Sequence, residues 1–429
     1  MYLGVDDTDS PDGMCTTFLA TELVREFSDL DLLGYPRLVR LNPNVSWKTR
    51  GNGAIALRLG KGRGDRCRIG ELAGTAVHAF STGVDTPPTE NLLQRAEDVL
   101  DRWAVRGAPD TNPGLVLLPQ KPPQQLYWRA VRGLVRKEEI SAVLMNGLHA
   151  ARGNGRGLIG ACAAVAWRPQ DRTYEVIAYR QQRLWGTERK IDPESVAALD
   201  ARFPSTFNNY DPVHRKIVIA PGSPCPILFG IRGEDPRVLP DAMRSVRSEP
   251  ADRWLVYLTN HGTDDHLTST HLLEPYTSVR ASALVDSHPR TIQGGHVLLD
   301  IRIGKERITA AAYEPSKEMR RVVRRLVPGD RLTVCGNVRA HPRTLNLEKF
   351  RIVHLAEVRA KFENPLCPGC GRHMKSRGRD VGYRCPRCRT RASSATTMPL
   401  DRGIRVGWYE PPVCARRHIT KPLRRMERS

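Results

Sequence analysis

Three carboxylates stand within four residues near the start of the chain, at Asp6, Asp7 and Asp9. They follow a short apolar run, residues 2–5, which predicts a buried strand. Like charges this close repel, so the pKa of at least one carboxyl group rises unless a cation lies among them. Mg²⁺ is the best candidate, because it binds one or two carboxylates and completes its shell with water and phosphate oxygens. The segment therefore predicts a magnesium-dependent phosphate site.

Two hydroxyl groups lie shortly after these carboxylates, on Thr16 and Thr17. A Ser-Pro-Asp-Gly turn signal precedes them, and a helical pattern runs from there to about residue 27. Backbone N–H groups and the dipole at a helix N-terminus favour anions, so we expect a nucleoside-triphosphate site here. The structural alternative is that Asp9 is a turn residue and that Thr16 caps the helix.

Two loops share the sequence Arg-Gly-Asn-Gly and provide further candidate phosphate ligands. Glycines beside cationic side chains let backbone N–H groups approach an anion closely. We expect the loops to lead into strands at 54–59 and 158–167 and to line one pocket from two sides. The alternative is a pair of hairpin turns, in which Asn-Gly is common. The candidate ATP- and phosphate-binding residues are Thr17, Lys48, Arg50, Gly51, Asn52, Gly53, Arg152, Gly153, Asn154 and Gly155.

The elements that must position these residues alternate between strand and helix in the N-terminal half. This pattern predicts layered α/β or α+β packing with a small ferredoxin-like unit. Polar loops at strand ends are where α/β folds tend to place active sites. We expect strands at 37–41, 54–59, 115–118, 174–179, 227–231 and 253–258, and helices at 70–80, 90–105 and, for the most part, 127–151.

Residues 276–355 show a different pattern, with short strands that surround a single helix. Three strands, an amphipathic helix and two strands is the order of an OB-fold, a small barrel that commonly holds single-stranded nucleic acid. The strands are expected at 279–285, 295–303, 307–313, 331–339 and 347–353, and the helix at 317–326.

Four cysteines near the C-terminal end have the spacing of a structural zinc site. Cys367 and Cys370 form one C-x-x-C pair, Cys385 and Cys388 form another, and 14 residues separate the pairs. Two such knuckles complete a tetrahedral S₄ site for Zn²⁺. A ribbon this short has too small a core to fold alone, so the metal supplies folding energy. No open coordination position is expected, which argues against a catalytic zinc.

The charge of the chain points to a polyanionic partner. The 429 residues are enough for two to four domains and carry a formal net charge of +21. From residue 359 to the end there are 18 Lys and Arg against 5 Asp and Glu, so we expect a nucleic-acid contact there. Paired C-x-x-C cysteines favour metal binding in a reducing compartment over a disulfide scaffold. We find no signal peptide and no apolar run of membrane-spanning length, and we expect a cytoplasmic protein.

With these motifs in place, the chain resembles the archaeal tRNA(Ile) 2-agmatinylcytidine synthetase family. The resemblance rests on motifs spread over essentially the whole length, and the first of them is specific. It then extends through the OB-like region and the zinc-ribbon region. The motifs are DDTDSPDGMCTT, YPRLVRLNPN followed by KTRGNGA, ARGNGRGLIGA, WGTERKID, TFNNYD, IAPGSPCPILFGIRGE and LTNHGTDDHL.

The resemblance implies an enzyme that uses ATP to join agmatine to the wobble cytidine of a tRNA(Ile) with a CAU anticodon. It implies a multidomain α+β chain: a kinase-type domain with a ferredoxin-like domain in residues 1–270, an OB-fold in 271–358, and a zinc ribbon with a basic tail in 359–429. Asp6, Asp7 and Asp9 would be the ATP–Mg²⁺ residues. A threonine that becomes phosphorylated maps to Thr16, with Thr17 adjacent.

The chemistry of the residues agrees with this activity. Phosphoryl transfer to a pyrimidine carbonyl oxygen creates a leaving group that an amine can displace, and such transfer needs positioning and charge neutralisation. Agmatine is a dication, so its pocket should hold an acidic residue, for which Asp211 and Glu234 are candidates. One alternative is a non-catalytic protein that binds tRNA or single-stranded nucleic acid. Another is an RNA-modifying kinase or ligase with a different acceptor amine. The acidic cluster separates these classes, because a pure RNA binder gains nothing from carboxylates beside phosphate.

Overall fold

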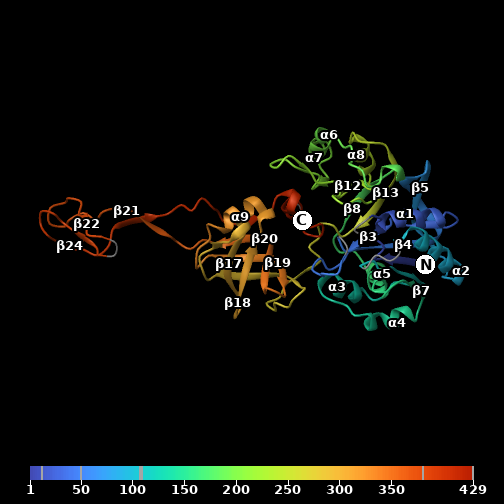
Figure 1. Ribbon diagram of the computed structural model, residues 1–429, viewed down its shortest axis with the longest axis horizontal. Coiled ribbons are helices and arrows are strands. Elements are labelled where there is room, and N and C mark those ends of the chain that lie inside the picture. The colour runs from blue at the N-terminus through green and yellow to red at the C-terminus, as the bar shows by residue number, and fades with distance from the viewer. Residues whose placement is uncertain (11–12, 49–50, 106–109, 379–380, 428–429) are drawn as a thin grey trace.

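Three bodies follow one another along the long axis of the molecule in the computed structural model (Figure 1). A large N-terminal body of sheet and helices lies at one end, a barrel lies in the middle, and a small ribbon projects at the other end. The structure describes residues 1–429 except for 11–12, 49–50, 106–109, 379–380 and 428–429. The expected multidomain α+β organisation is therefore confirmed.

The N-terminal body is built on a mixed sheet with eleven strands among the described residues. Its main path runs β7-β6-β1-β4-β3-β13-β8-β12-β9, and β2 and β5 pair with β4 beside this path. β1 pairs antiparallel with both β4 and β6, so the strand that carries the first carboxylates lies inside the sheet. The strands are β1 (Tyr2–Asp6), β2 (Asp31–Leu33), β3 (Arg37–Arg40), β4 (Gly53–Leu72), β5 (Thr75–Asp85), β6 (Gly114–Leu118), β7 (Leu148–Ala151), β8 (Thr173–Arg180), β9 (Thr206–Phe207), β12 (Ile227–Gly233) and β13 (Ala251–Thr259).

Helices cover both faces of this sheet around β1. Successive strand residues point to opposite faces, so a strand between two helical layers is apolar throughout. In β6, Leu115 and Leu117 pack in one core with α1 and α2, whereas Val116 and Leu118 pack in another with α3 and α5. The helices of this body are α1 (Thr16–Glu26), α2 (Glu90–Trp103), α3 (Gln124–Arg132), α4 (Ser141–Leu144), α5 (Gly157–Ala166), α6 (Pro193–Ala197), α7 (Leu199–Arg202) and α8 (Leu239–Ser245).

One expected strand, residues 158–167, is instead the helix α5. The apolar run is long enough for either element, and its small residues decide the outcome by letting a helix approach β1 closely. A Cβ atom added at Gly160 would lie only 1.8 Å from Oδ2 of Asp6. The same stretch that looked like a buried strand therefore packs its glycine against the first catalytic candidate.

Two expected helices were also wrong in whole or in part. Residues 70–80 lie in β4 and β5, which form a long hairpin around Ala73 and Gly74. Both turn residues have positive φ, 49° and 78°, which is the geometry of a type I′ hairpin turn. In the stretch 127–151, α3 ends at Arg132, only a 3₁₀ turn and the short α4 follow, and the last four residues form the edge strand β7.

The middle body is a closed five-stranded barrel with the order β15-β17-β18-β20-β19 and back to β15. β18 pairs parallel with β20, and α9 (Lys317–Val323) connects β18 to β19. This topology is consistent with the expected OB-fold. The barrel strands are β15 (Ser278–Val285), β17 (Val297–Ile303), β18 (Glu306–Ala312), β19 (Arg331–Arg339) and β20 (Thr344–His354).

The ribbon projects from the barrel on a two-stranded stem (Figure 1). β21 (Arg359–Glu363) pairs with β25 (Thr396–Pro399) to form this stem. Beyond it, the short strands β22 (Lys375–Ser376), β23 (Tyr383–Arg384) and β24 (Arg391–Ala392) form a separate sheet. The ribbon's buried core consists of Cys367, Met374 and Cys385.

After the ribbon, the chain returns to the junction between the barrel and the N-terminal body (Figure 1). β26 (Gly407–Tyr409) pairs with the barrel strand β20, and the short helix α10 (Leu423–Met426) follows near the C-terminal end. The sequence pattern suggested a separate basic tail here, but these residues pack against both larger bodies. Every helix among the described residues is too short or too polar to cross a membrane.

Candidate active site

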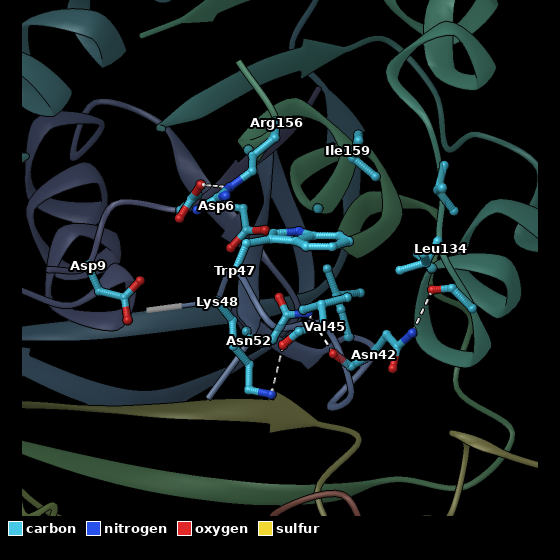
Figure 2. A pocket seen from close by; sticks show the side chains of 18 residues that line it. Asp6, Asp9, Asn42, Val45, Trp47, Lys48, Asn52, Leu134, Arg156 and Ile159 are labelled. Carbon is cyan, nitrogen blue, oxygen red and sulfur yellow. Dashed lines mark hydrogen bonds and ion pairs between the residues drawn. The ribbon is translucent and has the colours of Figure 1, made fainter. Parts of the chain in front are cut away.

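A hollow of about 110 Å³ opens where β1 ends, and the three N-terminal carboxylates border it (Figure 2). Asp6 is the last residue of β1, and Asp7 has a left-handed backbone with φ of 58° that turns the chain away from the sheet. In Figure 2, Asp9 lies on one side of the hollow and Leu134 on the other, with Trp47 between them. The structure thus brings the three predicted carboxylates to one cavity.

Burial makes the ionised form of the first two carboxylates costly. Burial raises the pKa of Asp6 well above its ordinary value, and the neighbouring charges of Asp7 and Asp9 add to the shift. The pKa of Asp7 is raised as well, mainly by burial, although Arg156 opposes the shift. A divalent cation among these oxygens would offset both penalties, as anticipated from their spacing.

Arg156 forms an ion pair with this cluster. Its Nε donates to Oδ2 of Asp7 at 2.8 Å, and the backbone N–H of Asn112 donates to the same oxygen at 3.2 Å. Arg156 immediately precedes α5, so its position follows from the close packing of that helix on β1. A guanidinium group in this position can also pair with a phosphate.

The two threonines lie beside a second hollow, of about 490 Å³, that shares Asp9 with the first. Thr16 and Thr17 begin α1, and the side chain of Cys15 caps the helix by accepting from the N–H of Phe18. The expected helix N-terminus is therefore confirmed, but Cys15 and not Thr16 is its cap. Asp9 and Gly53 line both hollows, so the threonines and the other carboxylates border adjoining cavities.

The first Arg-Gly-Asn-Gly loop borders both hollows. Asn52, Gly53 and Lys48 line the first, and Gly51 and Gly53 line the second. The Lys48 ammonium group donates to the carbonyl oxygen of Val45 at 3.1 Å, so it steadies the loop. Arg50 is outside the described residues.

The second Arg-Gly-Asn-Gly loop does not reach the wall of either hollow. Arg152 turns towards α2, where its Nη2 lies 2.8 Å from Asp101 and 3.2 Å from Glu97. Gly153, Asn154 and Gly155 are likewise absent from both linings. The loop acts indirectly, because the N–H of Asn154 donates to Asn112, whose own N–H donates to Asp7.

The floor of the second hollow contains a buried carboxylate between an arginine and a histidine. Glu175 lies 3.3 Å from Nε of Arg232 and 3.0 Å from Nδ1 of His261. Burial alone would raise the pKa of Glu175, but Arg232 and His261 outweigh it and hold the pKa well below its usual range. Burial lowers the pKa of His261 to about 3, so the imidazole is neutral at pH 7. Glu175 therefore stays ionised at the floor of the hollow.

The two candidates for binding agmatine lie outside the linings of both hollows. Asp211 is buried, and its carboxylate accepts from the N–H groups of Val213, His214 and Cys414. Glu234 lies 2.9 Å from Nε of Arg425. A role for either in binding agmatine stays a prediction, and the carboxylates that do face the second hollow are Asp9 and Glu175.

The four ribbon cysteines meet as their spacing predicts. Their ligand atoms all lie within 4.8 Å of one another, and the Sγ atoms of Cys370 and Cys385 are 3.6 Å apart. Four sulfur ligands at this separation fit a tetrahedral zinc ion with no open position.

Several residues of the two hollows were not singled out from the sequence. Arg156 could have been found as the cation directly after the second glycine loop, and Trp47 as the aromatic residue directly before Lys48. Glu175, Arg232 and His418 carry no such signal, because they come from β8, β12 and the C-terminal segment and meet only in the folded chain.

Comparison with family models matches nearly the entire N-terminal body and the ribbon. Residues 2–151 match the TiaS TCKD domain, residues 155–266 the TiaS FLD domain, and residues 364–404 the TiaS C-terminal zinc ribbon domain. The matches place most of the lining of the first hollow in the first of these domains, and the lining residues of α5 with Arg156 in the second.

Curated relatives and solved structures extend the similarity to the full length. The chain is 39% identical to the tRNA(Ile) 2-agmatinylcytidine synthetase TiaS of Archaeoglobus fulgidus, covering 99% of this chain and 97% of that one. It is 35% identical to the TiaS of Methanocaldococcus jannaschii, covering 99% and 98%. A solved complex of TiaS with tRNA(Ile) and ATP superposes with a TM-score of 0.86 at 38% identity, and a complex of TiaS with tRNA(Ile), AMPCPP and agmatine with 0.83 at 36%, each covering 99% of this chain and 97% of that one.

Proposed function

The chain belongs to the TiaS family of tRNA(Ile) 2-agmatinylcytidine synthetases, and we propose that it conjugates agmatine to a cytidine of tRNA(Ile) with ATP as the energy source. The observation that carries this proposal is the geometry of the two hollows. A carboxylate-lined hollow for a nucleotide adjoins a larger one, and Asp9 borders both. Activation by a phosphoryl group and attack by an amine can then take place side by side.

ATP would lie in the first hollow with Mg²⁺ at the carboxylates. The donor set fits this ion, because Asp6, Asp7 and Asp9 offer only oxygen ligands and Mg²⁺ commonly takes one or two carboxylates plus phosphates and water. When bound, Mg²⁺ would neutralise phosphate charge and orient the γ-phosphoryl group. The raised pKa values of Asp6 and Asp7 support the assignment. They indicate that the ionised carboxylates are unfavourable where they are buried, and a bound cation would stabilise them.

The nucleotide would be held by residues of both walls. Trp47 is 44% exposed and presents an indole face on which a base can stack. Asn52 and Gly53 come from the glycine loop, and Arg156 faces them from the start of α5. The roles of Arg50, Arg152, Gly153, Asn154 and Gly155 in binding ATP remain sequence-based predictions.

The reaction then proceeds by two substitutions. The γ-phosphoryl group is transferred to the cytosine carbonyl oxygen and ADP departs. The primary amine of agmatine then attacks the ring carbon that carries this oxygen. Phosphate leaves with the oxygen, and the amine loses a proton. In a separate transfer, Thr16, or Thr17 beside it, would exchange its hydroxyl proton for the γ-phosphoryl group of an ATP molecule, and ADP would depart. N–H groups at the helix N-terminus would stabilise the resulting phosphate. Asp9 and Glu175 face the second hollow and are better placed than Asp211 or Glu234 to attract a cationic amine.

The remaining parts would present the RNA. We propose that the N-terminal body comprises a kinase-type and a ferredoxin-like domain within residues 1–270, followed by the OB-fold in 271–358 and the ribbon in 359–429. The barrel and ribbon would bind tRNA phosphates and hold a flipped wobble cytidine of a CAU anticodon loop at the second hollow. The zinc ion would be structural. These roles imply a cytoplasmic enzyme.

The test is ATP consumption in the presence and absence of each partner. We expect turnover that requires both agmatine and tRNA(Ile). Asp7→Asn should reduce turnover on the order of 10²–10³-fold and leave tRNA affinity unchanged, because it removes a charge that acts on the transferred phosphoryl group. Asp65→Asn is the matched control, since Asp65 is an exposed carboxylate in β4. Full turnover by Asp7→Asn would refute the site, and tRNA binding without ATP consumption by the wild type would favour a non-catalytic RNA-binding protein.

A further inference from the structure

The C-terminal segment, residues 413–427, is basic in sequence but directs its charges inward. Arg416 and Arg417 pair with Glu410 and Glu348 at 2.7 and 3.2 Å. Further along, Arg425 pairs with Asp171 at 2.8 Å and with Glu234 at 2.9 Å. The segment was expected to bind RNA phosphates, but these cations already have carboxylate partners within the fold. We call residues 413–427 the C-terminal clasp.

The clasp joins three parts of the molecule. On the barrel, the hydroxyl of Thr420 donates to Glu348 at 2.8 Å. In the loop between β3 and β4, Asn44 accepts a hydrogen bond from Nη1 of Arg417 at 2.9 Å. In the region of β9, Nη1 of Arg416 donates to Asn208 at 2.8 Å. The clasp therefore fixes the distance between the barrel and the two hollows.

His418 lies at the point where the clasp meets the second hollow. The N–H of Gly262 donates to the carbonyl oxygen of His418 at 2.9 Å, which anchors its backbone. Its ring remains exposed and lines the hollow. Nη2 of Arg232 lies 2.7 Å from Nδ1 of His418, and a guanidinium group can only donate, so Nδ1 accepts. The imidazole is therefore neutral in this arrangement and holds its proton on Nε2.

This contact completes a line of side chains across the floor of the hollow. Nε of Arg40 donates to Nε2 of His261 at 2.6 Å, His261 adjoins Glu175, and Glu175 adjoins Arg232. Arg40 also donates to the carbonyl oxygen of Gly51 in the glycine loop. His418 lies at the end of this series of contacts, where it accepts a hydrogen bond from Arg232. It is the residue of the series that comes from the clasp.

We propose that His418 is a positioning residue for the conjugation step, which it serves by holding the guanidinium group of Arg232 in place beneath the second hollow. The inference rests on the proposed function, since it assigns the second hollow to the acceptor side of that reaction. Without an acceptor at His418, the Nη2 group of Arg232 is free to turn into the space that the cytidine and amine must occupy. The clasp thus connects the barrel, which we propose to bind RNA, to the second hollow in the N-terminal body.

The test compares three histidine variants in steady-state conjugation of agmatine to tRNA(Ile). His418→Leu removes the acceptor at similar volume, and His418→Asn retains an oxygen acceptor close to the position of Nδ1. His149→Leu is the control, because His149 is exposed in β7 and lines neither hollow. Affinity for tRNA and for ATP, thermal unfolding and zinc content are measured for each variant.

We expect His418→Leu to lower kcat on the order of 10–100-fold, since small errors of placement cost this much. Its tRNA and ATP affinities should match the wild type, His418→Asn should regain most of the lost rate, and His149→Leu should be unaffected. The proposal is overturned if His418→Leu keeps full kcat, if His418→Asn is as poor as His418→Leu, or if the loss lies in tRNA affinity. Absence of conjugation by the wild type would instead overturn the proposed function, and this inference with it.

Discussion

The acidic hollow and the zinc ribbon each bring together ionisable groups that repel one another when charged. The two regions differ in the size of the hydrophobic core that holds these groups in place. In the N-terminal body, Asp6 and Asp7 lie against a sheet whose two faces are covered by helices and whose cores extend over most of residues 1–260. In the ribbon, four cysteines meet around a small buried core, which among its described residues consists of Cys367, Met374 and Cys385. A large apolar core can hold unfavourable charges in place before a ligand arrives, whereas a small one depends on the ion.

The difference has a functional meaning. A preformed carboxylate cluster bears the cost of burying like charges, and the cation that we propose to bind there would offset this cost. The ribbon stores no such strain, because its thiols and its metal form one structural unit. The fold of the N-terminal body should therefore not depend on a metal ion, whereas the fold of the ribbon should.

Removal of zinc should have the largest effect, because it should unfold the ribbon and leave the N-terminal body folded. Structural zinc contributes roughly 10–16 kcal/mol to the folding of small metal-dependent domains. Cys385→Ser should abolish zinc binding and unfold residues 364–404, which hydrogen exchange would report as loss of protection there. Cys67→Ser, at an exposed cysteine in β4, should keep the full zinc content. A ribbon that stays protected without zinc would contradict this account.

Overpacking at α5 should be the next largest effect. Gly160→Ala places a methyl group 1.8 Å from the carboxylate oxygen of Asp6, so either α5 or β1 must move. We expect a loss of about 1–3 kcal/mol in the free energy of unfolding, with impaired ATP binding. Gly222→Ala is a suitable control, because an added Cβ atom there meets no neighbouring atom within 4 Å and Gly222 does not line the first hollow. Chemical denaturation and nucleotide titration measure both effects, and equal stability of the two variants would refute the close contact.

Acid should weaken the N-terminal body through His261. Its pKa falls from the ordinary 6.5 to about 3 in the folded chain. Between these two pH values the histidine is protonated in the unfolded chain and neutral in the folded chain. Stability is then lost as the pH falls below 6.5, by at most about 1.4 kcal/mol for each pH unit down to the folded pKa. Asp6 and Asp7, whose pKa values are raised, act in the opposite direction.

The contribution of His261 is isolated by comparing the wild type with His261→Gln at pH 6.5 and pH 5. Both chains retain the carboxylates, so the difference between their slopes belongs to the histidine. We expect the free energy of unfolding to fall more steeply for the wild type, as measured by urea denaturation. Parallel slopes would show that His261 is protonated in the folded chain.

Local signals in the sequence predicted the parts of the site that lie on one stretch of chain. Asp6, Asp7, Asp9 and the start of α1 follow from an apolar run, a turn and a helical pattern, and the four cysteines follow from their spacing. The OB-like order of the barrel was equally visible, because its strands are consecutive.

What the sequence did not reveal depends on tertiary contact. The run 158–167 suits a buried strand or a buried helix equally, and only its fit against β1 selects α5. Arg152 shares its motif with the first glycine loop, yet Glu97 and Asp101 on α2 attract it away from the hollow. The basic residues at the C-terminal end looked like an RNA-binding tail, because their carboxylate partners are far away in the sequence.

The most direct measurement of the central claim is mass spectrometry of nucleosides from tRNA(Ile) after incubation with the protein, ATP and agmatine. The account predicts that one cytidine gains the mass of agmatine less one water, and that the shift vanishes when either ATP or agmatine is omitted and in the Asp7→Asn variant. An unchanged cytidine in the complete mixture, or a shift that persists without ATP, would contradict it.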